Sequence, residues 1–468
     1  MATSSLFNLI LEIDKGKRYF IQNTLTGKGA FVDSALCRDL MVSPSTLGSK
    51  EELIELGALV EDEETERRCL EMEMNRFRYS SPGHISLTIL TTSKCNLCCP
   101  YCYEAVLSEA GFSEVMDVET EAALVPFLEA QLQGAVTEFS VTWYGGEPLL
   151  NLDTIFRLTP VFIDACSKKG ITYRATVVTN ATLLDLDILK RLTGDAAVSS
   201  FQITLEAGKR RHDTSRISIN GQPTYEQIIA AAAFIIEQCN VDIRVNVDAS
   251  STFHEIKEVL DSLRDAGVLE SGRSSVYLGR LLYFLNKSRI VDNRQIDEAN
   301  YAALIAHFLP YLYGLPACKT EEQKLKLLLN FVSKKGPQKQ CGAVSPNSMV
   351  VDAAGRLYKC WEEVGQPSRA VADVRRPDYY NKRNLAFWLG SGYWKNPSCK
   401  YCPVLPVCKS GCAYFSLSGY PKATYRCDFV FPVVLSALIR LYARKLFSEE
   451  VSSVSVVNWP GYPADIPL

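Results

Sequence analysis

The chain has 468 residues, a formal net charge of −3 and an isoelectric point near 6.0, and 47% of its residues are hydrophobic. This length predicts about three domains, and the small, scattered charge gives no basic footprint for nucleic acid. No window is apolar enough for a membrane helix. We expect no signal peptide in residues 1–20, because Glu12 and Asp14 interrupt the apolar run. A cytoplasmic protein is therefore predicted.

Residues 1–80 are predicted to form a small separate unit. Two strand-like runs, LFNLILEID and KRYFIQNT, flank the turn residues Lys15–Lys17. Two short helical patterns follow near 34–41 and 50–56, and a charged linker over 61–78 is expected to be helical.

From residue 84 onward, short β-rich runs alternate with amphipathic helical stretches. Strands are predicted at 84–92, 137–144, 172–179, 199–205, 241–248 and 275–284, and helices at 118–133, 152–168, 185–193, 224–238 and 253–265. Such alternation predicts βα units around a parallel sheet. Six units are too few for an eight-stranded barrel, so we expect an α/β fold with a partial, open (β/α)6 barrel.

The last third of the chain changes character. Two helices are predicted within 297–334, whereas 341–430 is rich in cysteines and turns and has little periodicity, as in a domain organised by metal. An apolar helix follows at 431–447. We divide the chain into four units, at residues 1–80, 84–334, 335–430 and 431–468.

Sixteen cysteines are present, and eleven of them fall in two clusters, at 95–102 and 341–427. In a reducing cytosol, clustered cysteines usually bind metal or react. The isolated ones are predicted to be small buried hydrophobic residues: Cys37, Cys69, Cys166, Cys239 and Cys318.

The first cluster, in the stretch SKCNLCCPYCYE, allows two triplets of metal ligands, since either Cys98 or Cys99 can join Cys95 and Cys102. Three thiolates leave one coordination position open, as a catalytic site requires. The spacing by itself neither chooses between the triplets nor excludes zinc.

The pattern Cys95-x3-Cys99-x2-Cys102, with Tyr101 before the last cysteine, resembles the signature of the radical S-adenosylmethionine (SAM) enzymes. In that family three cysteines hold a [4Fe–4S] cluster, SAM chelates its fourth iron, and reductive cleavage yields a hydrogen-abstracting 5′-deoxyadenosyl radical. The resemblance makes these three cysteines the catalytic ligands and Cys98 the spare.

Further motifs follow in the family's order. YGGEP resembles the GGEP motif that binds the methionyl ammonium, and VVTNATLL resembles the ribose-side strand. QITLEAGKRRHDTSR resembles a segment that meets the methionyl carboxylate, although Glu206-Ala207-Gly208 replaces Asp-Gly-Pro. YLGRLLYF is expected to line the adenine pocket. The implied SAM-binding residues are Tyr101, Gly145, Gly146, Glu147, Pro148, Thr179, Asn180, Thr204, Arg216 and Leu281.

The second cluster resembles the SPASM domain, which carries auxiliary iron–sulfur clusters in radical SAM enzymes that modify peptides and proteins. The resemblance implies two further [4Fe–4S] clusters. One would be held by Cys399, Cys402, Cys408 and Cys427, and the other by Cys341, Cys360 and Cys412 with either an open iron or Cys318. A pair of zinc sites is the alternative.

The N-terminal unit resembles the winged-helix-like elements that bind the leader of a peptide substrate as an extra strand; a plain extension of the barrel is the alternative. The whole chain resembles maturases of ribosomal peptides, which install thioether, C–C or C–O crosslinks and use a flavodoxin- or ferredoxin-type electron donor. The runner-up is an anaerobic sulfatase-maturing enzyme that forms formylglycine. In that group an Asp base follows the cysteine at the position of Cys360, where this chain has Trp361.

Overall fold

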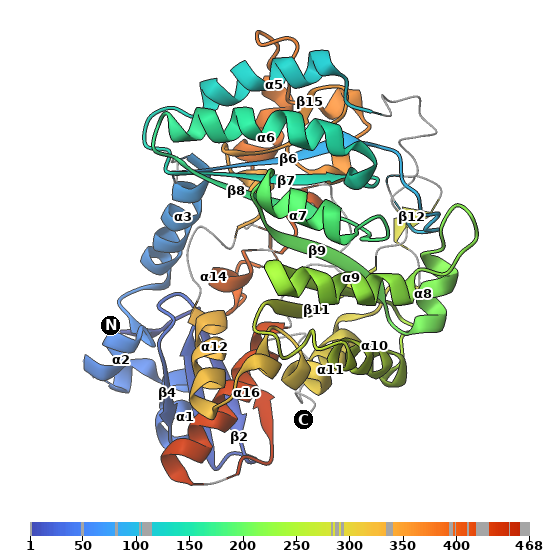
Figure 1. Cartoon of the computed structure of the whole chain (residues 1–468). Coiled ribbons are helices and arrows are strands. Elements are labelled where there is room, and N and C mark those ends of the chain that lie inside the picture. Colours follow the sequence, from blue (N-terminus) through green and yellow to red (C-terminus); the bar gives the residue numbers. More distant parts are fainter. Residues whose placement is uncertain are drawn as a thin grey trace.

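The computed structural model describes residues 2–47, 51–79, 83–102, 104, 115–281, 284–285, 290–291, 294–333, 340–392, 396–397, 399–409, 411–417, 430–448 and 450–458. A curved nine-stranded sheet fills the centre of the molecule, and a four-stranded sheet lies at one end (Figure 1).

Six parallel strands, in the order β11-β10-β9-β8-β7-β6, form most of the central sheet. They confirm the six predicted βα units and an open sheet. Two strands are shorter than predicted: β8 ends at Val178 and β11 at Arg280. The strands are β6 (His84–Thr92), β7 (Glu138–Gly145), β8 (Thr172–Val178), β9 (Val198–Glu206), β10 (Asn240–Val247) and β11 (Ser274–Arg280).

Five long helices cover the outer face of this sheet (Figure 1), and three of them start after a residue whose side chain caps the first turn. Asp117 and Asp185 accept hydrogen bonds from the first turns of α5 and α7, and Thr252 forms a capping box with Glu255 at α10. A short helix, α8 (Lys209–Ser215), was not predicted. The long helices are α5 (Val118–Gln131), α6 (Leu152–Ser167), α7 (Leu186–Gly194), α9 (Tyr225–Gln238) and α10 (Phe253–Asp265).

The cysteine-rich region extends the central sheet. β14 (Ser348–Val351) pairs in parallel with β6, and the short strands β15 (Arg356–Tyr358) and β16 (Ala372–Asp373) continue the sheet antiparallel. The strand β14 in the weakly periodic region 341–430 therefore depends on a partner far away in the sequence. In the register of this pair, Val350 lies opposite Thr88, 262 residues earlier. Short helices complete this region: α13 (Lys382–Leu385), α14 (Leu405–Cys408) and α15 (Ala413–Leu417).

The small sheet combines both ends of the chain. Its strand order is β17-β2-β3-β4, so that β17 (Val454–Val456) pairs with β2 (Asn8–Ile13), and β3 (Arg18–Asn23) pairs with β4 (Gly29–Val32). The sequence did not indicate this role for the C-terminal segment. The other N-terminal elements are β1 (Thr3–Ser4), β5 (Leu59–Val60), α1 (Ser34–Val42), α2 (Glu51–Leu56) and α3 (Glu63–Tyr79).

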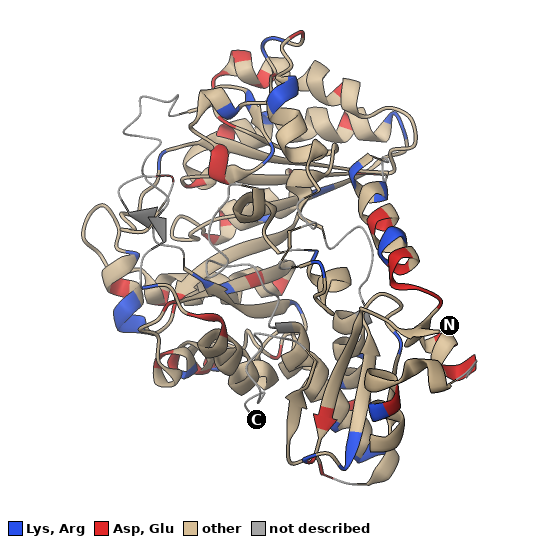
Figure 2. Cartoon of the chain, turned by 180° about the vertical axis from the view of Figure 1, so that it is seen from behind, with Lys and Arg blue, Asp and Glu red and all other residues tan. Residues whose placement is uncertain are grey.

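Three helices, α11 (Glu298–Phe308), α12 (Glu321–Ser333) and α16 (Val430–Phe447), lie between the small sheet and the lower end of the central sheet (Figure 1). A short hairpin, β12 (Phe284–Leu285) and β13 (Ile290–Val291), precedes them. Acidic and basic residues are interspersed on the face seen in Figure 2. In the described ranges, none of the helices combines the length and apolarity needed to cross a bilayer.

Candidate metal and cofactor site

The first cysteine loop begins directly after β6, at the carboxyl end of the parallel strands, where folds of this class place their chemistry. Cys98 is exposed, whereas Cys95, Cys99 and Cys102 are each partly buried. The backbone N–H of Cys98 donates to the Ile217 carbonyl at 2.9 Å. The segment after α8 therefore supports the loop, and exposure sets Cys98 apart from the other three cysteines.

Gly145 and Gly146 pack on the backbone that leads into this loop. Gly145 has a φ of +129°, and a Cβ on Gly146 would lie 2.3 Å from the Lys94 carbonyl oxygen. The Gly146 N–H donates to the Thr92 carbonyl at 3.0 Å, and the Glu147 N–H to the Lys94 carbonyl at 2.8 Å. Only glycine allows so close an approach, and the pair thereby fixes the start of the cysteine loop.

Glu147 is a fully buried carboxylate. Its Oε1 accepts from the Thr179 hydroxyl at 2.7 Å and the Leu149 N–H at 3.0 Å, and its Oε2 accepts from the Asn180 N–H at 2.8 Å. Burial raises the pKa of Glu147 although these hydrogen bonds oppose the shift. A carboxylate has about four acceptor positions, so Oε2 retains capacity for one further donor. Pro148 follows directly and begins a short 3-10 helix.

Asn180 connects the end of β8 to the cysteine loop. Its Nδ2 donates to the Asn96 side chain at 2.8 Å and lies 3.7 Å from the Cys95 sulfur. Its Oδ1 accepts from the Thr182 hydroxyl at 2.7 Å. Both residues were predicted near the cofactor. Asn180 contacts Cys95 and Asn96 directly, and Thr179 is joined to this group by its hydrogen bond to Glu147.

A buried polar network joins the cysteine loop to β9 and β10. The Tyr101 hydroxyl donates to Glu206 Oε1, which also accepts from Asn246 Nδ2 at 2.8 Å, and Arg216 Nη1 donates to the Tyr101 hydroxyl at 3.2 Å. Glu206 Oε2 and Arg216 Nε are buried and have no hydrogen-bond partner among the described residues. Burial raises the pKa of Glu206, and the charge of Arg216 opposes this. Sequence reasoning gave Glu206 no role and missed Asn246; the signal was a polar residue within the last two positions of each of two buried strands.

The last two predicted cofactor residues lie farther along the sheet. Thr204 is partly buried on β9. It lies on the same face of the strand as Glu206, because Glu206 follows two residues later. Leu281 is buried, follows β11, and donates its N–H to the Val247 carbonyl at 2.9 Å. The structure thus places both towards the carboxyl ends of strands on either side of β10.

Two thiols of the loop, those of Cys95 and Cys99, lose their protons less readily than an ordinary cysteine. Burial raises the pKa of Cys95 to about 11, and burial raises the pKa of Cys99 against the opposing charge of Arg216. A metal would supply the positive charge that bare thiolates lack there. Thiolates bind zinc, with Zn–S distances of about 2.3 Å. An iron–sulfur cluster spreads its thiolates over several irons, and the donor set fits that group.

In the second cysteine region, Cys341, Cys360 and Cys412 lie near one another. Burial, followed by the charge of Cys341 and, more weakly, that of Cys412, raises the pKa of the Cys360 thiol. All three pack against the core around the buried Trp388. Lys359 is buried beside Cys360, and burial lowers its pKa to about 7.

The remaining cysteines occupy a tight turn and its surroundings. The Cys402 N–H donates to the Cys399 carbonyl at 3.0 Å, which repeats the turn between Cys99 and Cys102 at 3.1 Å. Cys408 ends α14. The predicted fourth ligand, Cys427, lies outside the described residues. Cys318 lies between α11 and α12 with its sulfur 3.9 Å from the Gly314 carbonyl, apart from the cysteines that pack around Trp388.

Trp361 joins the two cysteine regions. It is 50% exposed, and its ring centroid lies 6.1 Å from that of Tyr144, the first residue of YGGEP. Glu362 follows it and is partly buried. The next carboxylate, Glu363, is fully engaged, because it accepts from Trp388 Nε1 at 2.9 Å and pairs with Arg369 at 2.8 Å. The residue after Cys360 therefore contacts the end of β7, where YGGEP begins.

Part of this core is similar in sequence to known proteins. Residues 89–279 match the family model described as the Radical SAM superfamily. A cysteine-type anaerobic sulfatase-maturating enzyme of Clostridium perfringens is 20% identical over 334 residues, 69% of this chain and 86% of that protein. A serine-type anaerobic sulfatase-maturating enzyme of Klebsiella aerogenes is 27% identical over 166 residues, 36% of this chain and 40% of that protein.

Solved structures share the fold. Native anSMEcpe with bound AdoMet and the Cp18Cys peptide matches with a TM-score of 0.57 and 18% identity, and the match covers 78% of this chain and 98% of that one. Native anSMEcpe with bound AdoMet matches with a TM-score of 0.58 over the same shares. At this identity the likeness concerns the fold.

Proposed function

We propose that this chain, which carries a radical SAM domain in residues 89–279, is an enzyme that oxidises a residue of a peptide or protein by hydrogen abstraction. Cys95, Cys99 and Cys102 would hold the [4Fe–4S] cluster, and SAM would bind at its open iron. When bound, the two groups together supply a 5′-deoxyadenosyl radical. The protein's part is to bind, to orient and to exclude water.

The observation that carries this proposal is the support of the cysteine loop by the neighbouring strands. Gly146 and Glu147 hold its first residues, Asn180 contacts Cys95, and Tyr101 is fixed by Glu206 and Arg216. A site held by several strand ends places its ligands reproducibly. A merely structural cysteine loop would not require a fully buried carboxylate with spare acceptor capacity beside it.

We assign the residues around the cysteine loop to individual groups of SAM. The remaining acceptor position of Glu147 Oε2 suits the methionyl ammonium, and a guanidinium such as Arg216 suits the methionyl carboxylate. Gly145, Gly146 and Pro148 shape the ammonium side, Thr179 and Asn180 the ribose side, and Thr204 and Leu281 the remaining walls. Tyr101 and Glu206 are assigned to holding the loop.

Formylglycine formation is the first candidate reaction, because the curated relatives are sulfatase-maturating enzymes. Oxidation of a Cys or Ser side chain then needs a base near the substrate. Trp361 stands where that group has its Asp, and Glu363 is already paired with Arg369. We assign the proton acceptor to Glu362, whose carboxylate lies next along the chain.

Crosslinking of a ribosomal peptide is the second candidate. It is favoured by Trp361 in place of an acid and by the small N-terminal sheet. In that sheet β4 pairs only with β3 among the described strands, so a leader peptide could add as a further strand there. The winged-helix-like role of residues 1–80 and the SPASM role of residues 335–430 belong to this proposal.

The auxiliary clusters complete the proposal. Cys341, Cys360 and Cys412 would hold one [4Fe–4S] cluster, and Cys399, Cys402 and Cys408 with Cys427 the other, for three clusters in all. They would take up or supply an electron or bind the substrate, and a flavodoxin- or ferredoxin-type protein would be the external electron donor.

The test uses peptide substrates deuterated at the Cβ of the target Cys or Ser, with the reconstituted enzyme, SAM and a reductant. Deuterium in 5′-deoxyadenosine supports hydrogen abstraction from that carbon. An aldehyde trapped by a hydrazide supports formylglycine, and a product without aldehyde but with an internal bond supports crosslinking. Cys99→Ala should stop deuterium transfer, whereas its exposed neighbour Cys98→Ala serves as the matched control. Transfer that survives Cys99→Ala would refute the proposal.

A further inference from the structure

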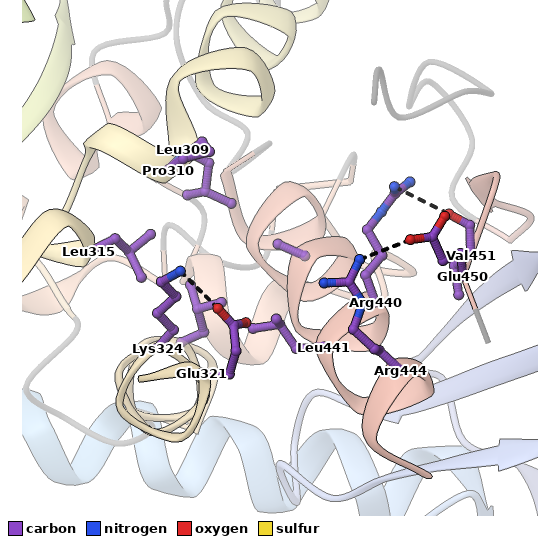
Figure 3. A pocket seen from close by; sticks show the side chains of 12 residues that line it. Leu309, Pro310, Leu315, Glu321, Lys324, Arg440, Leu441, Arg444, Glu450 and Val451 are labelled. Atoms are coloured by element: carbon purple, nitrogen blue, oxygen red, sulfur yellow. Dashed lines mark hydrogen bonds and ion pairs between the residues drawn. The ribbon is translucent and has the colours of Figure 1, made fainter. Parts of the chain in front are cut away.

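A cavity lies among α12, α16 and the segment that joins α11 to α12, and none of the cysteines of the two clusters lines it (Figure 3). Its volume is about 500 Å³, within the range of ligand sites in proteins. The walls are largely apolar and include Leu309, Leu315, Leu328, Leu441 and Val451.

Three cations line this cavity, and two of them are neutralised by acids. Lys324 pairs with Glu321 at 2.9 Å, and Arg444 pairs with Glu450 at 3.1 Å. Both pairs are visible at the cavity in Figure 3. The third cation, Arg440, comes from α16 one turn before Arg444.

Arg440 has no acidic partner among the described residues. Its Nη1 donates to the Val451 carbonyl at 3.4 Å, and its buried Nη2 has no hydrogen-bond partner in the part of the chain that the structure describes. Asp14, the acid whose charge reaches Arg440, is itself occupied by the Ser452 N–H and hydroxyl. A buried donor of a charged group that remains unsatisfied is costly, and burial lowers the pKa of Arg440 for this reason.

We propose that this cavity binds an apolar ligand that ends in a carboxylate, with the chain among the leucine side chains and the carboxylate on the guanidinium of Arg440, which lines the cavity. The shared chemistry fits a medium-chain carboxylic acid or the C-terminus of a peptide with apolar last residues. The guanidinium offers a fork of parallel donors that matches a carboxylate. The site is independent of the proposed reaction, because none of its lining residues belongs to the cysteine loops.

The test is calorimetric titration of the reconstituted full-length protein with decanoate and with decanol, both below their micellar concentrations. Decanoate should bind more tightly than decanol by on the order of tenfold to a hundredfold, as expected for a hydrogen bond to a charged group. A peptide ending in Leu-Leu, with a free and with an amidated C-terminus, distinguishes the two sources. Failure of decanoate and of the free peptide to bind would overturn the proposal.

Variants separate the site from surface charge. Arg440→Met should abolish the preference for the carboxylate, whereas Arg444→Met, which removes an exposed and already paired cation of the same helix, should leave it intact. Leu328→Trp should weaken both decanoate and decanol by filling the cavity, and it keeps the test valid if Arg440→Met does not fold. An unchanged preference in Arg440→Met, or unchanged affinities in Leu328→Trp, would overturn the proposal.

Discussion

Gly146→Ala is the change whose effect the structure predicts most directly. The added Cβ would lie 2.3 Å from the Lys94 carbonyl oxygen and 2.6 Å from both the Lys94 carbonyl carbon and the Ser93 carbonyl oxygen. All three are backbone atoms, so no side chain can rotate away. Ordinary contact begins at 3.4 Å, and the difference, 3.4 − 2.3, requires a separation of about 1.1 Å. The start of the cysteine loop must absorb that shift.

Two quantities should change. Overpacking of this kind costs about 1–3 kcal/mol, which urea unfolding followed by circular dichroism would detect. A displacement of about 1 Å in a catalytic arrangement costs on the order of 100-fold in rate, which the rate of 5′-deoxyadenosine formation would report. The loss of rate should therefore exceed the loss of stability, because the strain is located at the loop.

The matched control is Gly194→Ala at the end of α7. A Cβ at Gly194 has nothing within 4 Å, and neither Gly194 nor Gly146 requires a positive φ. Alanine in a helix is favoured over glycine by about 0.5–1 kcal/mol, so this variant should be as stable as the parent or slightly more so, and fully active. If Gly146→Ala behaved like Gly194→Ala in both assays, the argument that glycine fixes the loop would be refuted.

Three further predictions follow from single contacts. Cys98→Ala should retain 5′-deoxyadenosine formation, because Cys98 is the exposed cysteine of its loop; loss of the cluster, read by iron content, would mean that the wrong triplet was assigned. Glu362→Gln should slow oxidation of the peptide by on the order of 10²–10⁴-fold while SAM cleavage without substrate continues, and an unchanged peptide rate would remove Glu362 as the base. The hydrogen bond from Arg375 lowers the pKa of Asp117 to about 2. Because this folded-state pKa lies below the unfolded value of about 3.9, the parent should be more stable than Asp117→Asn above about pH 4 and lose that advantage as the pH falls towards 2. Equal urea midpoints for parent and Asp117→Asn at pH 7 would contradict the last of these.

The central sheet was predictable because local pattern and tertiary position agree there. β6 begins and ends at His84 and Thr92 as the alternation predicts, and α5 begins at Val118 directly after the capping residue Asp117. Helix and strand periods differ enough for such segments to be separated by pattern alone.

The elements that were missed depend on distant partners. β14 exists because it pairs with β6, and β17 because it completes the small sheet beside β2. Each of these strands has four residues or fewer, too short for any alternation to be distinctive. Their stability comes from long-range pairing, which no local window of sequence contains.

The candidate site was predicted in part. Motif spacing identified the cysteines, Glu147, Asn180 and Arg216 as candidates. It predicted which groups of the cofactors they would contact, but not how these residues contact one another. The structure adds that Glu206 accepts a hydrogen bond from the Tyr101 hydroxyl and that the ring of Trp361 contacts that of Tyr144. Both contacts join segments more than one hundred residues apart, and they arise from the order of strands in the sheet.

The most direct test of the central claim is to measure iron and sulfide after anaerobic reconstitution and to assay 5′-deoxyadenosine on addition of SAM and a reductant. The account predicts about twelve irons per chain, in three four-iron clusters, with 5′-deoxyadenosine formed. Replacing Cys95, Cys99 and Cys102 together by Ala should leave about eight irons and abolish 5′-deoxyadenosine. Zinc in place of iron, or no 5′-deoxyadenosine from the reconstituted parent, would contradict the account.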